Sequence, residues 1–381
     1  MKNIYLDHAA TSPVHPDVIE RITSVMQEIY GNPSSIHSFG RRARQIVDDA
    51  RTTIAKSIGC KYNELIFTSG GTEADNLAIK GIAQSYHGQG KHIITSSIEH
   101  HAVLHTCHSL EKEGFEVTYL PVNEEGLISL EELKDALRDD TILVSIMFGN
   151  NEVGTIQPIL EIGDLLENHQ AYFHTDAVQA YGLIPIDVNT LKVDALSVSA
   201  HKVNGPKGTG FLYVKEGINL SPALHGGEQE RKRRAGTENV TNIAGFEEAV
   251  KIAQSTMEQK AAYYRKLKSL LVKELQEREV KFYINGNQES SLPHVLNLSF
   301  PGLDVEAFLV NLDLGGVSVS SGSACTAGSI EPSHVLSAMF GSDSERLRNS
   351  IRFSFGLFNT EEDIVDAAEV VAAVAKRLTS Y

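Results

Sequence analysis

The stretch ELIFTSGGTEADNLAIKGIAQSYH, residues 64–87, decides the fold class. Its first part, ELIFTSG (64–70), is an apolar, β-branched burst that predicts a buried strand ending in a glycine turn. Its second part, residues 73–87, predicts a helix. A strand followed at once by a helix is the repeating unit of α/β proteins, so further copies of this unit are expected along the chain.

Similar apolar bursts recur downstream, and helical patterns lie between several of them. Further strands are predicted at 91–97, 115–122, 141–148, 171–177, 194–200 and 210–214. Helices are predicted at 37–59, 73–87, 100–114 and 238–279. Alternation of helices with near-continuous apolar strands predicts an α/β fold whose mainly parallel sheet is covered by helices.

The pattern changes after the long helix predicted at 238–279. Strands are predicted at 292–300, 317–321 and 351–355, with helices from residue 304 and over 360–378. This order predicts a smaller α+β domain, with the boundary near residue 256. A chain of 381 residues is long enough for two domains.

Composition excludes several classes of protein. The net charge of −15 argues against non-specific binding of nucleic acid, which needs a dense cationic face, so no direct contact with nucleic acid is expected. No apolar run is long enough for a membrane span, and the start MKNIYLDHAATSP lacks the features of a secretory signal. Cys60, Cys107 and Cys325 are too few and scattered for a disulfide framework, which favours a reducing, cytoplasmic location.

Ligands of open α/β sheets bind beyond the carboxyl ends of the strands, so the residues after each predicted strand are the first candidates. Gly70, Gly71 and Thr72 lie between a strand and a helix. The free N–H groups at a helix N-terminus bind anions, and glycines allow a close approach. A phosphate cradle is one interpretation, and a tight turn with Thr72 as the helix cap is the other.

Two later strands end in residues suited to a cationic nitrogen and to an aldehyde. Asp176 lies at a predicted strand end, with Gln179 about one helical turn later. This carboxylate suits a cationic nitrogen, although it also suits a helix cap. Lys202 follows strand 194–200. Burial there would lower its pKa and free a nucleophilic amine for Schiff-base chemistry, although a lysine can also extend from a strand end into water.

Histidines gather in EHHAVLHTCH, residues 99–108. His101, His105 and His108 share one helical face, as metal ligands can. No acidic residue completes that face and HExxH is absent, so no metal site is expected. His100 lies at the strand-to-helix junction instead, where it could stack on a planar ring or move protons.

Arginines suggest two further sites. The run ERKRRAGTEN (230–239) suits a phosphate, a subunit interface or a weak nucleic-acid patch. Arg352, in the predicted strand IRFSF, has the planar fork that matches a carboxylate, although a surface ion pair is the plainer interpretation. The phosphate cradle, the acid, the stacking histidine and the lysine described above are together the groups that pyridoxal phosphate needs.

These motifs together resemble the NifS/IscS family of cysteine desulfurases, pyridoxal-phosphate enzymes related to class-V aminotransferases. The resemblance covers essentially the whole chain. It rests on YLDHAATSP (5–13), GNPSSIHSFG (31–40), SGGTEADN (69–76), EHHAV (99–103), NNEVGT (150–155), HTDAVQ (174–179), SAHKVNGPKG (199–208), RRAGTEN (233–239), SSGSACTAG (320–328) and IRFSFG (351–356).

The resemblance implies aminotransferase fold type I. The large pyridoxal-phosphate-binding domain would comprise residues 15–255. Residues 1–14 and 256–381 would form the small domain, which carries the Cys325 loop. The resemblance also implies a homodimer.

The resemblance further implies roles around the cofactor ring. Lys202 would bind the cofactor covalently. Asp176 would pair with the pyridine nitrogen, and Gln179 would contact the ring hydroxyl. His100 would stack on the ring and help to move protons.

Other matched positions would bind the cofactor phosphate and the substrate. The phosphate ligands would be Gly71, Thr72, Ser199 and His201, with Thr237 contributed by the neighbouring subunit. Asn151 would help to hold cofactor and substrate. Arg352 would bind the substrate carboxylate, which implies an amino acid.

In this family the cysteine of such a loop is the nucleophile. Cys325 would take sulfur from L-cysteine as a persulfide and leave L-alanine; it could also ligate an iron–sulfur cluster transiently. The sulfur would serve tRNA thiolation or iron–sulfur cluster assembly. Members of the IscS type use a longer tail for a scaffold partner, whereas this chain ends at LTSY, which slightly favours a tRNA thiouridylase as acceptor.

Two alternatives stay open at this point. A related pyridoxal-phosphate enzyme, such as a transaminase, a selenocysteine lyase or a cysteine-sulfinate desulfinase, would need Lys202 and Asp176 but not Cys325. A non-catalytic sulfur carrier or metal-binding scaffold would use the histidine helix and Cys325. Cys60 and Cys107 have ordinary structural interpretations.

Overall fold

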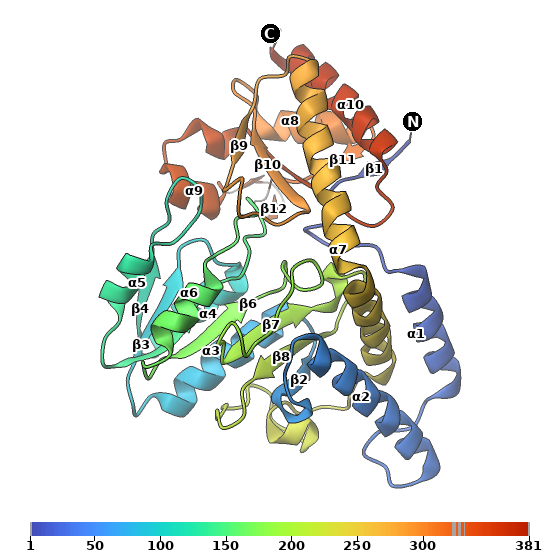
Figure 1. Ribbon diagram of the computed structural model, residues 1–381, viewed down its shortest axis with the longest axis vertical. Helices are drawn as coiled ribbons and strands as arrows, with labels where there is room; N and C mark the ends of the chain where they lie inside the picture. The colour runs from blue at the N-terminus through green and yellow to red at the C-terminus, as the bar shows by residue number, and fades with distance from the viewer. Residues whose placement is uncertain (1, 322–324, 327–328, 331, 380–381) are drawn as a thin grey trace.

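The computed structural model describes residues 2–321, 325–326, 329–330 and 332–379, with the backbone alone described at 325–326 and 329–330. Figure 1 shows a large α/β unit below and a smaller unit above, joined by the long helix α7 (Val240–Glu277). None of the helices in the described ranges has the length and apolar character that a membrane-spanning helix needs.

A seven-stranded sheet with the order β2-β8-β7-β6-β5-β3-β4 forms the centre of the large unit. Only β8 is antiparallel to its neighbours, so the predicted mainly parallel sheet is confirmed. The strands are β2 (Leu65–Thr68), β3 (His92–Ser96), β4 (Glu116–Leu120), β5 (Thr141–Ser145), β6 (Tyr172–Asp176), β7 (Ala195–Ser199) and β8 (Gly210–Val214).

Helices cover both faces of this sheet, which explains the continuous apolar strands. Successive residues Leu143 and Val144 of β5 belong to different apolar cores, one on each face. Only the edge strand β4 is partly exposed along most of its length. The helices of the large unit are α1 (Pro16–Glu28), α2 (Ser38–Ser57), α3 (Gly71–Tyr86), α4 (His101–Lys112), α5 (Leu130–Ala136) and α6 (Ile159–Leu166). Short 3₁₀-helices are η1 (Tyr62–Glu64), η2 (Ala200–Lys202) and η3 (Gln229–Lys232).

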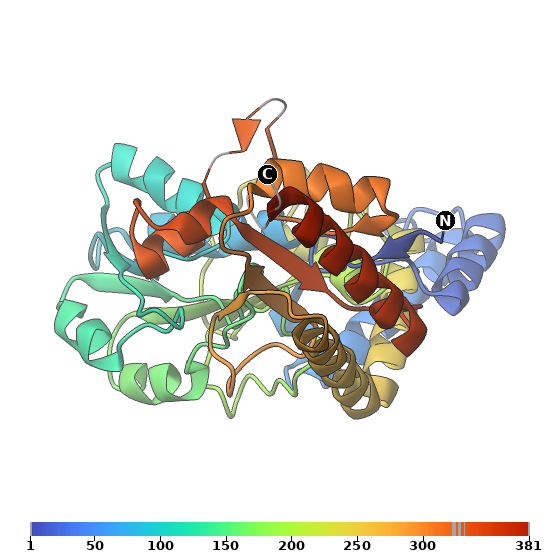
Figure 2. The same ribbon diagram turned by 90° about the horizontal axis from the view of Figure 1, so that it is seen from above.

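The small unit is built on an antiparallel sheet with the order β14-β10-β9. Seen from above, α7, α8 and α10 surround it (Figure 2). The elements of this C-terminal part of the chain are β9 (Tyr283–Asn285), β10 (Val295–Ser299), α8 (Val305–Leu314), β11 (Val317–Ser318), β12 (Cys325–Thr326), β13 (Ser329–Ile330), α9 (His334–Phe340), η4 (Glu345–Arg348), β14 (Ser350–Ser354) and α10 (Glu361–Thr379). Of these, α9 packs on the large unit. The predicted α+β character of this region is confirmed.

Helix α7 belongs to two apolar cores. Val240, Phe246 and Val250 pack in the core of the large unit, whereas Leu267 and Leu275 pack in that of the small unit. The predicted boundary near residue 256 falls between these sets, although the division into domains itself stays a prediction.

The N-terminal segment connects the two units. Strand β1 (Ile4–Tyr5) pairs in parallel with β11 of the small unit. A few residues later, the Ser12 hydroxyl donates to the backbone carbonyl of His201 in the large unit, at 2.6 Å. The residues between β1 and Ser12 therefore pass along the junction of the units.

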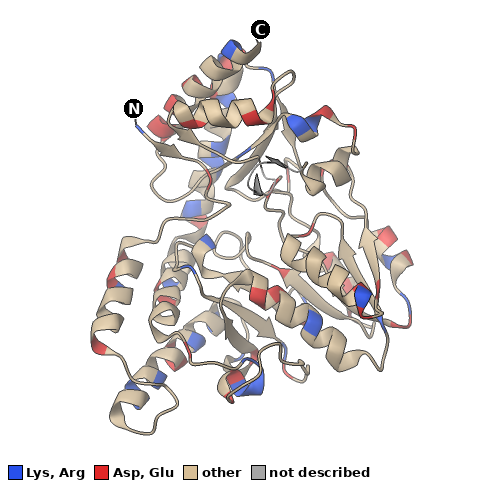
Figure 3. Ribbon diagram, turned by 180° about the vertical axis from the view of Figure 1, so that it is seen from behind, with Lys and Arg blue, Asp and Glu red and all other residues tan. Residues whose placement is uncertain are grey.

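Charges are interspersed over the molecule. In the part of the chain that Figure 3 colours by charge, basic and acidic residues both occur over the outer helices, and no helix is basic throughout. This distribution agrees with the net charge of −15.

Candidate active site

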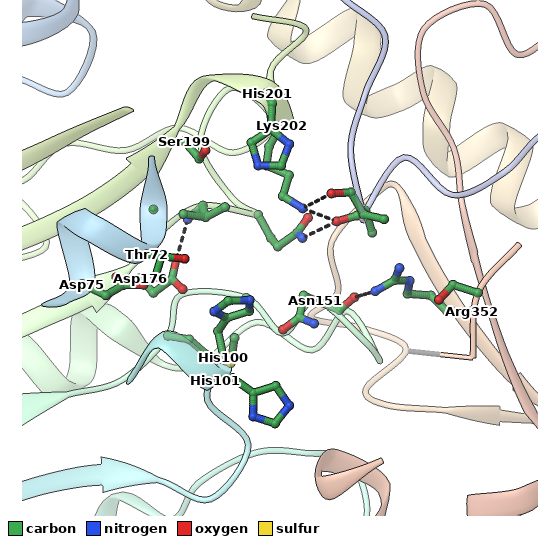
Figure 4. Close-up of a pocket in the computed structure, with 18 residues that line it drawn as sticks. Thr72, Asp75, His100, His101, Asn151, Asp176, Ser199, His201, Lys202 and Arg352 are labelled. Atoms are coloured by element: carbon green, nitrogen blue, oxygen red, sulfur yellow. Dashed lines mark hydrogen bonds between the residues drawn. The ribbon is translucent and has the colours of Figure 1, made fainter. Parts of the chain in front are cut away.

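A cavity of about 380 Å³ lies between the carboxyl ends of the large sheet and the small unit. Figure 4 shows Asp176 and Arg352 at opposite ends of it, with Lys202 and His100 facing each other between them. The predicted site residues that line this cavity are Gly71, Thr72, His100, Asn151, Asp176, Gln179, Ser199, His201, Lys202 and Arg352. The strand ends thus bring together nearly all the residues that sequence analysis selected.

Lys202 ends the short helix η2, directly after β7. Its ammonium group donates to the backbone carbonyl of Ala9 and, at 2.7 Å, to that of Ala10. Burial, and after it the charge of Arg352, lowers the pKa of Lys202 to about 8, although Asp176 opposes this shift. Lys202 therefore points into the cavity rather than into water, and its amine is partly neutral near physiological pH.

Asp176 lies at the carboxyl end of β6 and is buried. Its Oδ1 accepts a hydrogen bond of 2.9 Å from the backbone N–H of Val178. Burial raises the pKa of this carboxyl to about 6, while that hydrogen bond and the charge of Lys202 lower it. The group is still mostly ionised at neutral pH, as a partner for a cationic ring nitrogen must be.

His100 is the N-cap residue of α4, and its Nδ1 accepts from the backbone N–H of Ala102 at 3.1 Å. Burial, and after it the charge of Lys202, lowers the pKa of His100 to about 4. The ring is therefore neutral at physiological pH, with its proton on Nε2. Capping the helix and facing the cavity are compatible roles for this side chain.

The N-terminus of α3 forms a concave anion site. A Cβ atom added to Gly71 would lie only 2.8 Å from Cγ2 of Val178, so the backbone needs glycine there. Gly70 is the N-cap and makes no side-chain cap, so the interpretation of Thr72 as the helix cap is wrong. Among the described residues, the Thr72 and Ser199 hydroxyls have no hydrogen-bond partner, which leaves them available for a phosphate.

Arg352 enters the cavity from β14 and is 5% exposed, so its ion pair is not the surface pair of the plainer interpretation. Its guanidinium donates to Asp7 Oδ1 at 2.8 Å and to the backbone carbonyl of Asn151 at 2.9 Å. Its buried Nε has no hydrogen-bond partner in the described part of the chain. That unused donor suits a substrate carboxylate.

Gln179 is held from two sides. Its amide donates to the backbone carbonyl of Ala9 at 2.9 Å, and its Oε1 lies 3.1 Å from Nε2 of His294. Burial lowers the pKa of His294 to about 3, so this ring is neutral and donates to Gln179. The amide orientation is thus fixed, and one amide N–H stays available to the cavity.

Two predicted site residues are not among the described residues that line the cavity. Thr237 is exposed, in the segment between η3 and α7, and its predicted contact with a neighbouring subunit stays a prediction. The side chain of Cys325 lies outside the described part of the structure, whereas its backbone forms β12, paired with β13. The chain leading to Cys325 starts at the cavity, because Ser320 lines it.

Asp75 is not among the predicted site residues, but it lines the cavity next to Asp176 in Figure 4. Asp75 is 1% exposed, and its Oδ1 lies 3.7 Å from Nε2 of His174. Burial, and after it the charge of Asp176, raises the pKa of Asp75 well above its usual range. The signal was an acidic residue on the apolar face of a helix, beside Ala74 and Ala78.

The histidine face of α4 exists as predicted. The His101 and His105 rings lie 5.0 Å apart, and the His105 and His108 rings 6.4 Å apart. Within the described ranges, no group of histidine, cysteine and acidic side chains is arranged to hold a metal ion.

The cavity fits pyridoxal phosphate. The helix N-terminus and two unpartnered hydroxyls suit its phosphate, and the Asp176 carboxylate suits its ring nitrogen. The Lys202 amine, with its lowered pKa, suits its aldehyde. The electrostatic character of each wall therefore matches one part of this cofactor.

Comparisons with known proteins point the same way. Residues 4–366 match the family model described as aminotransferase class-V. IscS 1 of Bacillus subtilis (strain 168) is 61% identical over 379 residues, covering 100% of both chains. The cysteine desulfurase IscS of Dictyoglomus turgidum (strain DSM 6724 / Z-1310) is 49% identical over 99% of this chain and 95% of its own.

A solved structure of a NifS-like protein superposes with a TM-score of 0.91 at 37% identity, covering 100% of both chains. The fold, the cavity and these relatives agree along the whole length of the chain. The chain therefore belongs to the NifS/IscS cysteine desulfurases of the class-V aminotransferase family, which depend on pyridoxal phosphate.

Proposed function

We propose that this enzyme transfers the sulfur of L-cysteine to Cys325 and releases L-alanine. The observation that carries the proposal is the pairing, in one cavity, of the Lys202 amine with the unused Nε donor of Arg352. An amine of lowered pKa serves the cofactor, and a buried guanidinium serves the carboxylate of an amino acid. The relatives named as cysteine desulfurases support cysteine as that amino acid.

The transfer to Cys325 balances without an external oxidant. The C–S bond of L-cysteine breaks and an S–S bond to Cys325 forms. The electron pair of the broken bond stays with the carbon, which takes up a proton and becomes the methyl group of alanine. The transferred sulfur is oxidised to the level of a persulfide.

The residues around the cavity divide the remaining work. Lys202 binds the cofactor, and Asp176 holds a negative charge opposite the ring nitrogen. Arg352 fixes the substrate carboxylate, with Asn151 beside it. His100, neutral and with a proton on Nε2, can donate that proton near the reacting groups. When bound, pyridoxal phosphate supplies an electron sink for the charge that develops on the substrate.

We further propose that the enzyme works as a homodimer. Support comes from exposed apolar side chains on α1 and the segment leading into α2, where Tyr30 is 74% and Ile36 is 91% exposed. Such a patch is typical of a protein interface. Thr237, which is exposed in this chain, would then contribute to the phosphate site of the partner.

The persulfide is passed to a sulfur acceptor protein. A tRNA thiouridylase is the first candidate and an iron–sulfur scaffold the second. We propose a reducing, cytoplasmic location, since the chemistry needs a free thiol at Cys325 and since Cys60 and Cys107 form no disulfide.

The decisive test compares alanine formation from L-cysteine by the wild type, Cys325→Ala and the control Cys60→Ala. We expect alanine from the wild type and the control, and none above background from Cys325→Ala. Equal alanine from all three would reject Cys325 as the nucleophile. It would favour a related lyase, such as a selenocysteine lyase or a cysteine-sulfinate desulfinase, on the same cofactor.

A further inference from the structure

The described residues that flank Cys325 contact different units, Ser320 before it and helix α9 after it. At its N-terminal end, Ser320 pairs with Arg352 of β14. The Ser320 N–H donates to the Arg352 carbonyl at 3.2 Å, and the Arg352 N–H donates to the Ser320 carbonyl at 2.6 Å. This end therefore belongs to the sheet of the small unit.

The C-terminal end of the segment leads into α9, which packs on the large unit. Leu336 and Met339 of α9 share an apolar cluster with Ile98, Met147 and Val153, all buried. Ile98 lies just after β3 and Met147 just after β5, at the carboxyl edge of the large sheet. The described residues on the two sides of Cys325 therefore contact different units.

Hydrogen bonds at the start of α9 fix its position on the large unit. The Ser333 hydroxyl donates to Oε2 of Glu152, and both residues are buried, at 3% and 2% exposed. The same hydroxyl accepts from the backbone N–H of Leu336 at 3.1 Å and caps α9. His334 Nε2 lies 2.9 Å from the backbone carbonyl of Glu99, to which it donates.

These contacts reach the two loops that carry cavity residues. Glu152 directly follows Asn151, and Glu99 directly precedes His100. The His334 ring also lies 4.7 Å from the ring of His101, which lines the cavity. The start of α9 is thus tied to the loops where the substrate binds.

Fixing this end shortens the tether of the Cys325 thiol. An extended chain spans at most about 3.5 Å per residue, so the distance between the last fixed residue and Cys325 limits where the thiol can go. A shorter tether raises the effective concentration of the tethered group, and that concentration falls roughly as the −3/2 power of tether length. Releasing α9 would lengthen the tether on this side.

We propose that Ser333, through Glu152, and His334, through Glu99, are positioning residues that fix the C-terminal end of the Cys325 segment beside the substrate site. The inference rests on the proposed function of Cys325. It assigns a kinetic role to contacts that touch neither the cofactor nor the substrate.

The test separates binding of substrate from attack by the thiol. Cofactor-loaded Ser333→Ala, His334→Ala and the double variant are mixed with L-cysteine in the absence of reductant. The change in the visible absorbance of the bound cofactor reports binding and does not need Cys325. Alkylation at timed intervals, followed by mass spectrometry, gives the rate of persulfide formation on Cys325.

We expect each single variant to lower the persulfide rate about three- to tenfold and the double variant to lower it further. The half-saturating L-cysteine concentration for the absorbance change should stay within about twofold of the wild type. Ser333→Thr keeps the hydroxyl and should restore the rate. Ser337→Ala, one turn along α9, is the matched control and should leave the rate unchanged.

Two results would overturn the inference. One is a double variant that forms the persulfide at the wild-type rate. The other is a parallel loss of the absorbance change and the persulfide rate, which would indicate general damage to the site. If the proposed function itself were wrong, the wild type would form no persulfide on Cys325, which distinguishes that outcome from the two above.

Discussion

The two walls of the cavity stabilise charge in different ways. On the wall from the large unit, burial shifts the pKa values of Lys202 and Asp176 toward neutrality, to about 8 and about 6. On the wall from the small unit, Arg352 is buried but paired with Asp7. Burial without an opposite charge in contact favours the neutral form of an ionisable side chain. Burial in an ion pair favours the charged form. The large unit therefore supplies side chains that can gain or lose a proton near neutral pH, and the small unit supplies a permanent positive charge for the substrate.

The largest loss of activity should come from a substitution in the wall of the large unit. Lys202→Ala removes the amine that binds the cofactor, so alanine formation should fall to background. The visible absorbance of the cofactor-loaded enzyme should change as well. Alanine assays and absorption spectra check both points. Lys207→Ala, at an exposed lysine nearby, is the control and should form alanine at the wild-type rate. Alanine formation above background in Lys202→Ala would contradict the role of Lys202 in binding the cofactor.

Substitution of Arg352 tests whether the small unit binds the substrate carboxylate. Arg352→Lys keeps the charge but loses the planar fork, and it leaves Asp7 with a poorer partner. We expect kcat/KM for L-cysteine to fall roughly a hundredfold, with most of the change in KM, because a lysine ammonium cannot reproduce the several fixed N–H donors of the guanidinium at a buried site. Asp7→Asn should raise KM by a smaller factor. Steady-state kinetics that showed a lower kcat at constant KM would contradict a binding role.

The pH dependence of cofactor capture tests the lowered pKa of Lys202. Only the neutral amine attacks an aldehyde, so the capture rate of cofactor-free enzyme should rise about tenfold per pH unit below pH 8 and level off above it. Asp176 raises the pKa of Lys202, so Asp176→Asn should move the midpoint to lower pH. Rapid-mixing absorbance from pH 6 to 10 measures both curves. A midpoint near the ordinary lysine value would show that burial does not act as we describe.

The smallest effect concerns the phosphate cradle. In Gly71→Ala the new methyl group would lie 2.8 Å from Cγ2 of Val178, so the helix N-terminus or the Val178 side chain must shift, and the cradle changes shape. We expect the dissociation constant for pyridoxal phosphate to rise about tenfold. Equilibrium titration of the cofactor-free enzyme measures it. Gly88→Ala, where a Cβ meets no atom within 4 Å, is the control. Equal affinities of the two variants for pyridoxal phosphate would show that Gly71 does not shape the phosphate site.

Local patterns predicted most of the fold and most of the cavity. Strands such as β5 are buried on both faces, so their apolar runs are unambiguous, and the residues after β6 and β7 were found by their position at strand ends. The resemblance to a known family added Asn151 and Ser199, which carry no local signal of their own.

Other features could not be read from local patterns because they depend on distant parts of the chain. The Asp7–Arg352 pair joins residues 345 positions apart. Helix α9 is short, and its docking on the large unit depends on Ile98 and Met147, which belong to other elements. The apolar face of α3 marks Asp75 as a buried acid, but its place in the cavity depends on the packing of α3 against β6 and β7.

The central claim is that sulfur passes from L-cysteine to Cys325. Its most direct test is one turnover with sulfur-labelled L-cysteine, followed by site-resolved mass spectrometry of the alkylated enzyme. The account predicts labelled sulfur on the Cys325 peptide and none on the peptides of Cys60 and Cys107. Alanine formed in amounts equal to the enzyme, with no label on Cys325, would contradict it.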